Sequence, residues 1–444
     1  MRSDDFTWQS DPRRTRRRFI RDTALLTAAG PLTAFPMCAA AEPPAAEAAE
    51  QAHAEIWRRF IGPHNVMLDF TMLDGSVSLP TPEECRAGKP NALGWWAPIE
   101  NGAMFCGLYL DAAVNRWRRT RSAEDAEKAR RLMEGLLFLN SISDVPGFVG
   151  RGVSTDGKSH YAMGSNDQTF PWFLGLWRYL DSGLAGNDER RIVAHLSETA
   201  DAIVKLNWAM PAEPPFGRRG GFLGLGFDNV PRLLFVAKMM HVLSGDAKWD
   251  AIYRAALARR GGKDQHSGLE VCERGMFFET AYHHTWTSCC SVGALRGLWE
   301  LEKDETLRAA FAQGLQASAD IAFQYLRLAQ QFDRDDKSFF DPDWRRCMLP
   351  LWKPQQTEQE AQDLAHEQLR AFCKQSPRRS KECDFVREPA SAAWIVTLAP
   401  DPVILTQRAA DIRRVIAHYN YAALYYCTFF WVESAWWRLV AAAM

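Results

Sequence analysis

The sequence predicts an all-α protein built from consecutive helical hairpins, and three observations support this prediction. Beyond residue 98, apolar residues recur at the three-to-four-residue spacing that is typical of helices. Segments that are apolar on nearly every side alternate with segments that are polar on one face. Strand patterns are scarce, and a chain of 444 residues with 47% apolar residues can bury a large core.

Residues 1–41 read as a leader that precedes the fold. Residues 15–21, TRRRFIR, resemble a twin-arginine export signal, and a moderately apolar stretch follows up to the small residues 39–41. A competing lipoprotein site at Cys38 lacks the small residues that such a site needs before the cysteine. We therefore expect a periplasmic or secreted protein. Without the leader the chain has 46 basic and 50 acidic residues, a balance that argues against nucleic-acid binding.

The sequence carries no signature of a metal or an organic cofactor. Its ten cysteines form no CxxC pair, and Cys373 and Cys383 are the nearest plausible disulfide partners. Dinucleotide, haem and iron–sulfur motifs are absent. No apolar run reaches the length that a membrane-spanning helix needs. We therefore expect an enzyme without a cofactor and without a membrane span, and the sequence does not indicate its oligomeric state.

The mature chain is expected to form one domain, residues 53–444, after a linker at 42–52. An amphipathic piece at 53–60 leads into a loop-rich segment, 61–97. Each later hairpin joins an apolar helix to an amphipathic helix through a turn rich in Gly, Asp or Asn. The predicted helices are 98–118 with 123–140, 168–182 with 187–208, 229–244 with 246–260, 291–302 with 304–328, 389–399 with 402–417, and 420–440.

Long connections separate the hairpins and are rich in Gly, Pro, His and aromatic residues. They cover 141–167, 209–228, 261–290 and 329–355. Long loops in compact domains commonly carry function. An inner ring of apolar helices, an outer ring of amphipathic helices and loops gathered at one end describe an α/α toroid.

This hairpin order, over residues 53–440, resembles the six-hairpin glycosidase-like superfamily. That superfamily of (α/α)6 barrels includes unsaturated glucuronyl hydrolases, other glycoside hydrolases and many polysaccharide lyases. The resemblance rests on hairpin order and aromatic-rich loops, and it implies a carbohydrate-active enzyme with an oligo- or polysaccharide substrate.

Proline marks the starts of several apolar helices, because proline lacks an N–H and is tolerated in the first helical turn. An acidic residue lies beside each such proline. If these helices run in the same direction, their acids converge on one mouth. Capping of the helix is the alternative explanation for each acid. The four acids are Glu100, Asp167, Asp228 and Glu388.

Asp167 differs from the other three because its loop holds more hydrogen-bonding side chains than a cap requires. These neighbours are Arg151, His160, Tyr161, Asn166 and Gln168, which we expect to bind substrate. Glycoside hydrolysis needs two carboxyl groups, one to protonate the leaving oxygen and one to activate water or attack the sugar. We predict Asp167 and Glu100 as this catalytic pair. By resemblance, Asp167 would suit the acid and base role of the aspartate in glucuronyl hydrolases.

Aromatic and basic side chains complete the predicted sugar site. Aromatic rings stack on the C–H faces of sugars. His283 and His284 are adjacent and would point in different directions, which favours sugar binding or proton transfer over metal binding. An arginine can grip a uronate carboxylate. The further expected substrate-binding residues are Trp95, Trp96, Trp172, Asp228, His283, His284, Trp286, Arg387 and Glu388, whereas Trp177 is expected in the core.

Several functions remain open from the sequence. The first is an exported glycoside hydrolase acting on oligosaccharides, including those that contain uronic acids. The second is a polysaccharide lyase, in which Tyr161 or a histidine removes a proton and an arginine or asparagine neutralises the uronate. The third is a carbohydrate-binding toroid without activity. A sugar epimerase with paired histidines is a weaker alternative.

Overall fold

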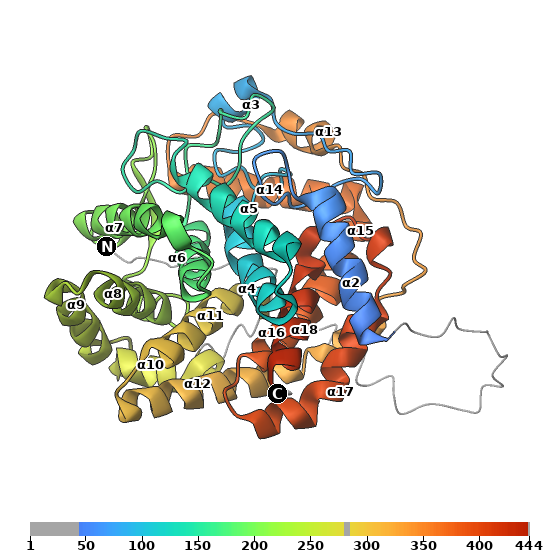
Figure 1. Cartoon of the computed structure of the whole chain (residues 1–444). Coiled ribbons are helices and arrows are strands. Elements are labelled where there is room, and N and C mark those ends of the chain that lie inside the picture. The colour runs from blue at the N-terminus through green and yellow to red at the C-terminus, as the bar shows by residue number, and fades with distance from the viewer. Residues whose placement is uncertain (1–43, 279–284, 443–444) are drawn as a thin grey trace.

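The computed structural model describes residues 44–278 and 285–442, and their regular structure is almost entirely helical (Figure 1). The prediction of an all-α protein is therefore confirmed. The named strands of these residues form two short antiparallel pairs, β1 (Ala209–Pro211) with β2 (Arg218–Gly221) and β3 (Arg260–Gly261) with β4 (His266–Ser267). Among the described helices, none is long and apolar enough to cross a membrane.

One set of helices is buried on most of its surface, as expected for segments that are apolar on nearly every side. Its contacts form a cycle: α4 packs against α6, α6 and α8 against α11, α11 against α16, α16 against α18, and α18 against α4. The members are α4 (Gly102–Thr120), α6 (Asn166–Asp181), α8 (Val230–Ser244), α11 (Thr285–Leu301), α16 (Glu388–Thr397) and α18 (Phe430–Ala442).

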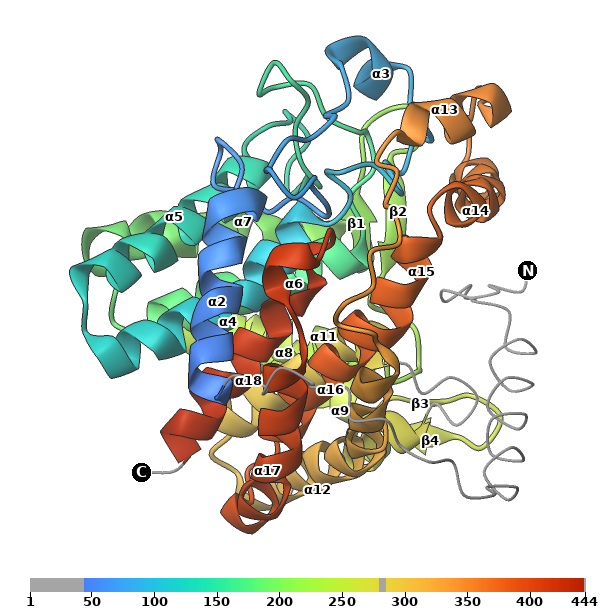
Figure 2. The ribbon, with the colours of Figure 1, turned by 90° about the vertical axis from the view of Figure 1, so that its right-hand side faces the viewer.

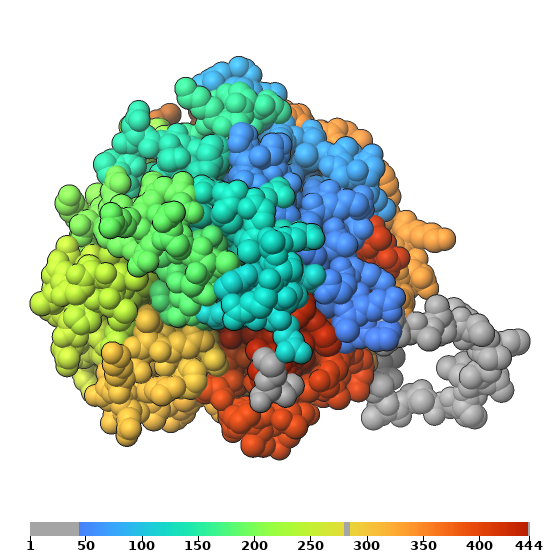
Figure 3. Space-filling model, in the orientation of Figure 1, coloured from blue at the N-terminus to red at the C-terminus, as the bar shows by residue number. Residues whose placement is uncertain are grey.

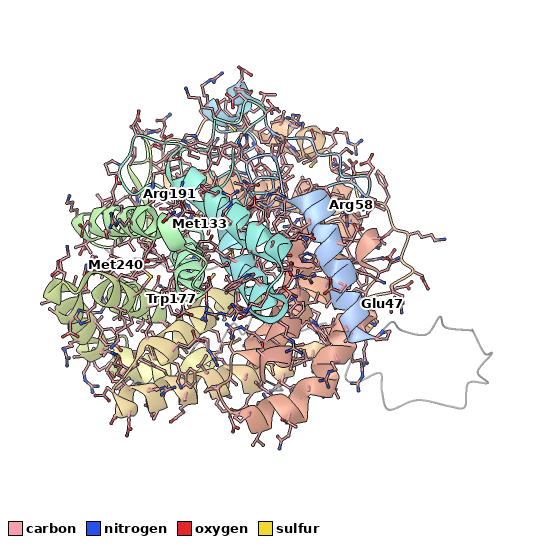
Figure 4. The ribbon with its side chains drawn as sticks, in the orientation of Figure 1. Glu47, Arg58, Met133, Trp177, Arg191 and Met240 are labelled. Carbon is pink, nitrogen blue, oxygen red and sulfur yellow. The ribbon has the colours of Figure 1, made fainter. Side chains whose placement is uncertain are left out.

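Amphipathic helices flank this buried set, and the predicted hairpins agree with them to within several residues at most ends. Figure 4 labels Trp177 and Met240, which lie in the core on α6 and α8, and Glu47, Arg58 and Arg191, which lie at the surface. Trp177 was predicted there. The flanking helices are α2 (Ala45–Glu55), α5 (Ala123–Asn140), α7 (Glu189–Lys205), α9 (Ala247–Ala258), α12 (Glu305–Phe323) and α17 (Pro402–His418).

Aspartate or serine caps explain where several flanking helices begin. The side chain before each of these helices accepts a hydrogen bond from a backbone N–H of the first turn, which satisfies a donor that has no partner inside the helix. The capping residues are Ser122 for α5, Asp246 for α9, Asp304 for α12 and Asp401 for α17.

The structure corrects the sequence analysis at the N-terminal linker. Residues 42–52 were expected to be irregular, but the chain is helical from Ala45 and continues into the π-helical turn η2 (Ile56–Phe60). Alanine and glutamate favour helix, and Ala48, Ala49 and Ala52 are buried against the rest of the protein. Burial of this small apolar face turns the expected linker into a structural helix.

Helices also form in a region for which none was predicted, residues 344–387. The longest is α14 (Glu358–Gln375), which begins with a capping box between Thr357 and Glu360. With α3 (Pro82–Arg86) and residues 344–348, α14 lies toward one end of the molecule, at the top of Figures 1 and 2. The others are α13 (Trp344–Met348), η6 (Leu349–Leu351), α15 (Pro377–Glu382) and η7 (Cys383–Arg387).

Short helical elements occupy the remaining loops. The expected connection 261–290 contains α10 (Gly268–Arg274) and η4 (Gly275–Phe278), and the connection at 329–355 contains α13 and η6. The elements not yet named are η3 (Gly186–Asp188), η5 (Leu326–Gln331), η8 (Tyr421–Ala423) and η9 (Cys427–Phe429).

A buried polar cluster joins the N-terminal helix α2 to the C-terminal helix α18. His53 Nδ1 lies 2.9 Å from Glu433 Oε1, and the Tyr109 hydroxyl donates to Glu433 Oε2 at 2.5 Å. Lys128 Nζ lies 2.8 Å from the other ring nitrogen of His53. In the space-filling view the blue segment that contains α2 lies against the red C-terminal segment (Figure 3). The cluster therefore connects segments that are 380 residues apart.

A second buried polar network joins the middle of α4 to the C-terminal parts of α6 and α11. Asp111 accepts two hydrogen bonds of 2.7 Å from Arg438 and one of 3.1 Å from the Trp394 indole. Arg178 lies 3.4 Å from Asp111 and also pairs with Glu300. Although burial alone would raise it, the guanidinium groups of Arg438 and Arg178 hold the pKa of Asp111 at about 2. The network links five of the most buried helices.

Helices α4 and α6 approach so closely at two glycines that a side chain would not fit. A Cβ atom on Gly107 would lie 2.1 Å from the Pro171 carbonyl oxygen, and one on Gly175 would lie 2.7 Å from Gly107 Cα. We expect Gly107→Ala to lower the free energy of unfolding by about 3 kcal/mol, because the backbones must separate. Gly293→Ala is the control, since its Cβ would meet only side-chain ends at 3.1 Å or more. Equal losses in chemical denaturation would contradict this explanation.

Candidate functional site

The N-terminal ends of several buried helices lie close together, beneath the elements that cover the top of the molecule. Gln168, in the first turn of α6, accepts a hydrogen bond from the Met104 N–H of α4 at 3.1 Å. Thr285, at the start of α11, donates to Glu388 Oε2 at the start of α16 at 2.9 Å. These contacts place polar side chains from different hairpins at one end of the helices.

A small cavity lies at this end and holds about 20 Å³, which is room for about one water molecule. Residues from the loop before α4, from α11, from the segment α15–η7 and from the loop before α18 meet around it. They are Asp69, Glu100, Asn101, Phe105, Trp286, Arg379, Cys383, Arg387, Tyr426 and Thr428.

Asp69 and Glu100 bring two buried carboxyl groups to the cavity. Asp69 accepts hydrogen bonds from the Asn101 backbone N–H at 2.8 Å and from Asn101 Nδ2 at 2.7 Å, while Glu100 Oε2 accepts from the Trp96 N–H at 2.7 Å. Burial, together with the neighbouring Glu100 carboxylate, raises the pKa of Asp69. Burial also raises the pKa of Glu100. Such a pair can hold a proton at a pH where isolated carboxyls are ionised, as general acid–base catalysis requires.

Unsatisfied hydrogen-bonding groups also line the cavity. In the described part of the chain, Arg379 Nε, Arg387 Nε and the Tyr426 hydroxyl are buried and have no hydrogen-bond partner. The Arg379 guanidinium lies 4.9 Å from the ring centre of Trp96, and that of Arg387 lies 4.5 Å from Trp286. Because unpaired buried donors are costly, these groups are suited to binding a polar or anionic ligand.

Asp167 has a different environment from the one expected. Ser165 caps α6, so Asp167 is not the capping residue, and its carboxylate pairs with Arg232 at 2.8 Å with its side chain 43% exposed. Asp167 does not line the cavity. The structure therefore brings Glu100 together with Asp69, while the catalytic role of Asp167 stays a prediction.

Arg151 and Gln168 are buried, and their hydrogen bonds stabilise the loops around the site. Arg151 donates to the backbone carbonyls of Met163, Glu100 and Gly164. Burial and the neighbouring Arg219 lower the pKa of Arg151 to about 9. These contacts are with backbone, so Arg151 holds the Glu100 segment in position.

Other predicted sugar-binding side chains make contacts within the protein. His160 pairs with Glu213 at 3.1 Å, and the buried Tyr161 hydroxyl donates to the Lys89 carbonyl. Trp172 is fully buried and its indole donates to the Leu136 carbonyl. Trp95 is buried in an aromatic cluster with Trp96, whose indole donates to the Ala365 carbonyl. These four aromatic residues therefore pack inside the fold.

The remaining predicted residues divide between the cavity and its surroundings. Trp286 and Arg387 line the cavity, and Glu388 pairs with Arg387 at 3.2 Å. Asn166 and Asp228 are partly exposed at the starts of α6 and α8. His283 and His284 lie outside the described residues.

Within residues 44–278 and 285–442, no three His, Cys, Asp or Glu side chains are grouped so that they could hold a metal ion. The nine cysteines of these residues are free thiols, so Cys373 and Cys383, the nearest plausible partners in the sequence, form no bridge. Arg379 Nη1 instead donates to Cys373 Sγ at 3.5 Å.

Sequence reasoning missed three residues that define the cavity: Asp69, Arg379 and Tyr426. Asp69 is a single acid inside the apolar run VMLDFTM, a pattern that could have indicated a buried carboxyl group. Arg379 lies in an ordinary charged segment, and Tyr426 lies in an aromatic one. Nothing local in the sequence distinguishes these two from surface and core residues.

Comparison with known proteins gives no relative on which to base a function. The chain matches no family model, no curated protein and no solved structure.

Proposed function

We propose that this protein is an (α/α)6 toroid that acts as a glycoside hydrolase, with Glu100 and Asp69 as its acid–base pair. The observation that carries the proposal is the presence of these two buried carboxyl groups, both with raised pKa values, at one cavity. The cycle of contacts among the most buried helices supports the toroid.

The two carboxyl groups fit the requirements of glycosidic bond cleavage. Glu100 donates a proton to the leaving oxygen, and Asp69 removes a proton from the attacking water. A cavity with room for about one water molecule beside both groups favours the inverting reaction, in which water attacks directly. A sugar ring is larger than this cavity, so binding of substrate requires the side chains around it to move apart.

The basic and aromatic residues of the cavity favour acidic sugars over neutral ones. Arg379 and Arg387 bring two guanidinium groups with unpaired Nε atoms, and Trp286 brings an aromatic face. A uronate carboxylate accepts charge-assisted hydrogen bonds from guanidinium groups. The proposed substrates are therefore oligosaccharides that contain uronic acids.

A polysaccharide lyase is the second candidate, and the Tyr426 hydroxyl favours it. This hydroxyl lies at the cavity without a partner among the described residues, as a base that removes the proton beside a uronate carboxylate would. Arg379 or Arg387 would then neutralise the carboxylate. Burial raises the pKa of Tyr426, which opposes its ionisation and places this candidate second.

One assay on uronate-containing oligosaccharides and polymers separates the candidates. We expect new reducing ends, no gain in near-ultraviolet absorbance, and inversion at the released anomeric carbon in early proton NMR spectra. An absorbing unsaturated product would identify a lyase instead. Binding of these sugars without any product would support the third candidate, a carbohydrate-binding protein without activity, and would contradict the hydrolase.

We also propose that the protein is exported through its twin-arginine-like leader. The motif at residues 15–21, which precedes the described residues, supports this proposal. Replacing Arg16 and Arg17 by lysine should retain the protein in the cytoplasm, as measured by cell fractionation.

A further inference from the structure

The Glu388 side chain, at the start of α16, uses its two carboxylate oxygens for separate contacts. Oε2 accepts a hydrogen bond from the Trp286 backbone N–H at 3.3 Å and lies 2.9 Å from the Thr285 hydroxyl. Both partners belong to the first turn of α11, and the N–H groups of a first turn have no acceptor inside their helix. Oε1 accepts from Arg387 Nη2 at 3.2 Å. One oxygen therefore caps α11, and the other holds a residue that lines the cavity.

These contacts hold the Arg387 side chain on two sides. Its guanidinium carbon lies 4.5 Å from the centre of the Trp286 ring, and its Nη2 is bonded to Glu388. An arginine side chain has many rotamers, and fixing it before a ligand arrives lowers the entropy cost of binding. Arg387 Nε has no hydrogen-bond partner among the described residues. The guanidinium is thus held in place, with one donor unused on a residue that lines the cavity.

We propose that Glu388 is a positioning residue that holds the Arg387 guanidinium against Trp286 and so prepares Arg387 to bind the carboxylate of a ligand. Glu388 is 6% exposed and does not line the cavity, so it acts through Arg387 and does not touch the sugar. As a statement about ligand binding this rests on the proposed function, in which the ligand is a uronate. The position of Arg387 is nevertheless a property of the protein without ligand.

The alternative is a purely structural role for Glu388, as the cap of α11. Glu388→Gln distinguishes the two roles, because the glutamine carbonyl can still accept from Trp286 and lie beside the Thr285 hydroxyl. Its NH2 group then takes the place of Oε1 and faces Arg387 Nη2, and two donors cannot bond to each other. The variant therefore keeps the cap and releases Arg387.

NMR spectra of the whole protein with isotope-labelled arginine test the position of Arg387 without a ligand. Arg387→Lys removes one Nε–H signal and thereby assigns it. We expect the ring current of Trp286 to displace this signal in the parent protein, and we expect the signal to move toward the shift of free arginine in Glu388→Gln. An unchanged signal in folded Glu388→Gln would overturn the proposal.

Binding of a uronate-containing oligosaccharide tests the consequence of this position. Calorimetry is carried out in the Glu100→Gln background, in which turnover is expected to be slow. We expect Glu388→Gln to weaken binding about tenfold, the effect of one charge-assisted hydrogen bond, and to leave binding of the carboxyl-reduced sugar unchanged. In protein that already carries Arg387→Met, the same change should have no further effect. Equal losses for both sugars, or additive losses in the double variant, would contradict an action through Arg387.

Glu302→Gln is a matched control for this variant. Glu302 is also 6% exposed, and its carboxylate also accepts from a basic side chain, Lys238, from a hydroxyl, Tyr253, and from a backbone N–H. It follows the last residue of α11, at the opposite end of that helix, so its replacement should change neither the Arg387 signal nor the affinity. If the Arg387 signal responds as expected but the parent protein binds no uronate-containing sugar, the proposed function fails and the role of Glu388 in holding Arg387 stands.

Discussion

Glu100→Gln is expected to reduce turnover of the uronate-containing substrate by at least about 10²-fold, because the amide cannot donate the catalytic proton. The replacement has nearly the same shape, and the Gln carbonyl can still accept the Trp96 N–H. Loss of activity should therefore occur in a folded protein. Steady-state kinetics on purified protein, with circular dichroism as a check of folding, measure this effect.

Asp167→Asn is the comparison that decides between the two candidate acids. Asp167 is partly exposed and paired with Arg232, away from the lining of the cavity. We expect Asp167→Asn to retain more activity than Glu100→Gln. Full activity in Glu100→Gln together with none in Asp167→Asn would assign catalysis to Asp167 and refute the role of the cavity.

The same Glu100→Gln variant should change how stability depends on pH. Because burial raises the pKa of folded Glu100, its carboxyl stabilises the fold most below the pKa of the unfolded chain, about 4.3. That stabilisation is lost as the pH rises through the higher folded value. The parent protein therefore loses this stabilisation as the pH rises, and the variant does not. The free energy of unfolding of the variant minus that of the parent should increase from pH 4 toward about pH 8.

Asp111→Asn is expected to lower the free energy of unfolding by about 3–5 kcal/mol at neutral pH. The change leaves the buried Arg438 and Arg178 without the charge that they share. Asp250→Asn is the control: it removes a surface pair with Arg254 and should have only a small effect on stability. Denaturant unfolding measures both.

The pH dependence of the Asp111 effect has the opposite sign to that of Glu100. The pKa of folded Asp111 is held at about 2, so its stabilisation is present above the unfolded pKa, near 3.9, and is lost as the pH falls toward 2. The difference between parent and Asp111→Asn should therefore shrink in acid. A difference that stays constant from pH 7 to about pH 2 would contradict the ionic explanation.

Local patterns predict most of the helices because helix formation depends largely on residues that are close together in the sequence. Periodicity and turn residues predict hairpins such as α4 with α5 and α8 with α9, and the caps at Ser122 and Asp246 agree with them. Helix α2 was missed because its alanine-rich sequence resembles a linker, and only its contacts with distant elements such as α17 and α18 show that its small face is buried.

The site was less predictable than the fold, because its members are close in space and distant in sequence. Glu100, Trp286 and Arg387 could be proposed from their positions at helix starts. Asp69 and Arg379 could not, since each becomes distinctive only when the segments 61–101 and 377–387 meet at the cavity. Asp167 was predicted to be catalytic because its loop is rich in polar side chains. In the structure, most of these side chains form hydrogen bonds with one another or with the backbone.

The link between His53 and Glu433 also has a consequence for synthesis of the protein. Helix α2 leaves the ribosome early, but its partner α18 follows only after nearly the whole chain has been made, about 20 to 80 seconds later at ordinary elongation rates. The waiting helix exposes mainly alanine methyl groups, at Ala48, Ala49 and Ala52, which offer little apolar area to unwanted partners. An N-terminal helix with larger apolar residues would bind more tightly in the finished protein but would be more prone to aggregate during translation.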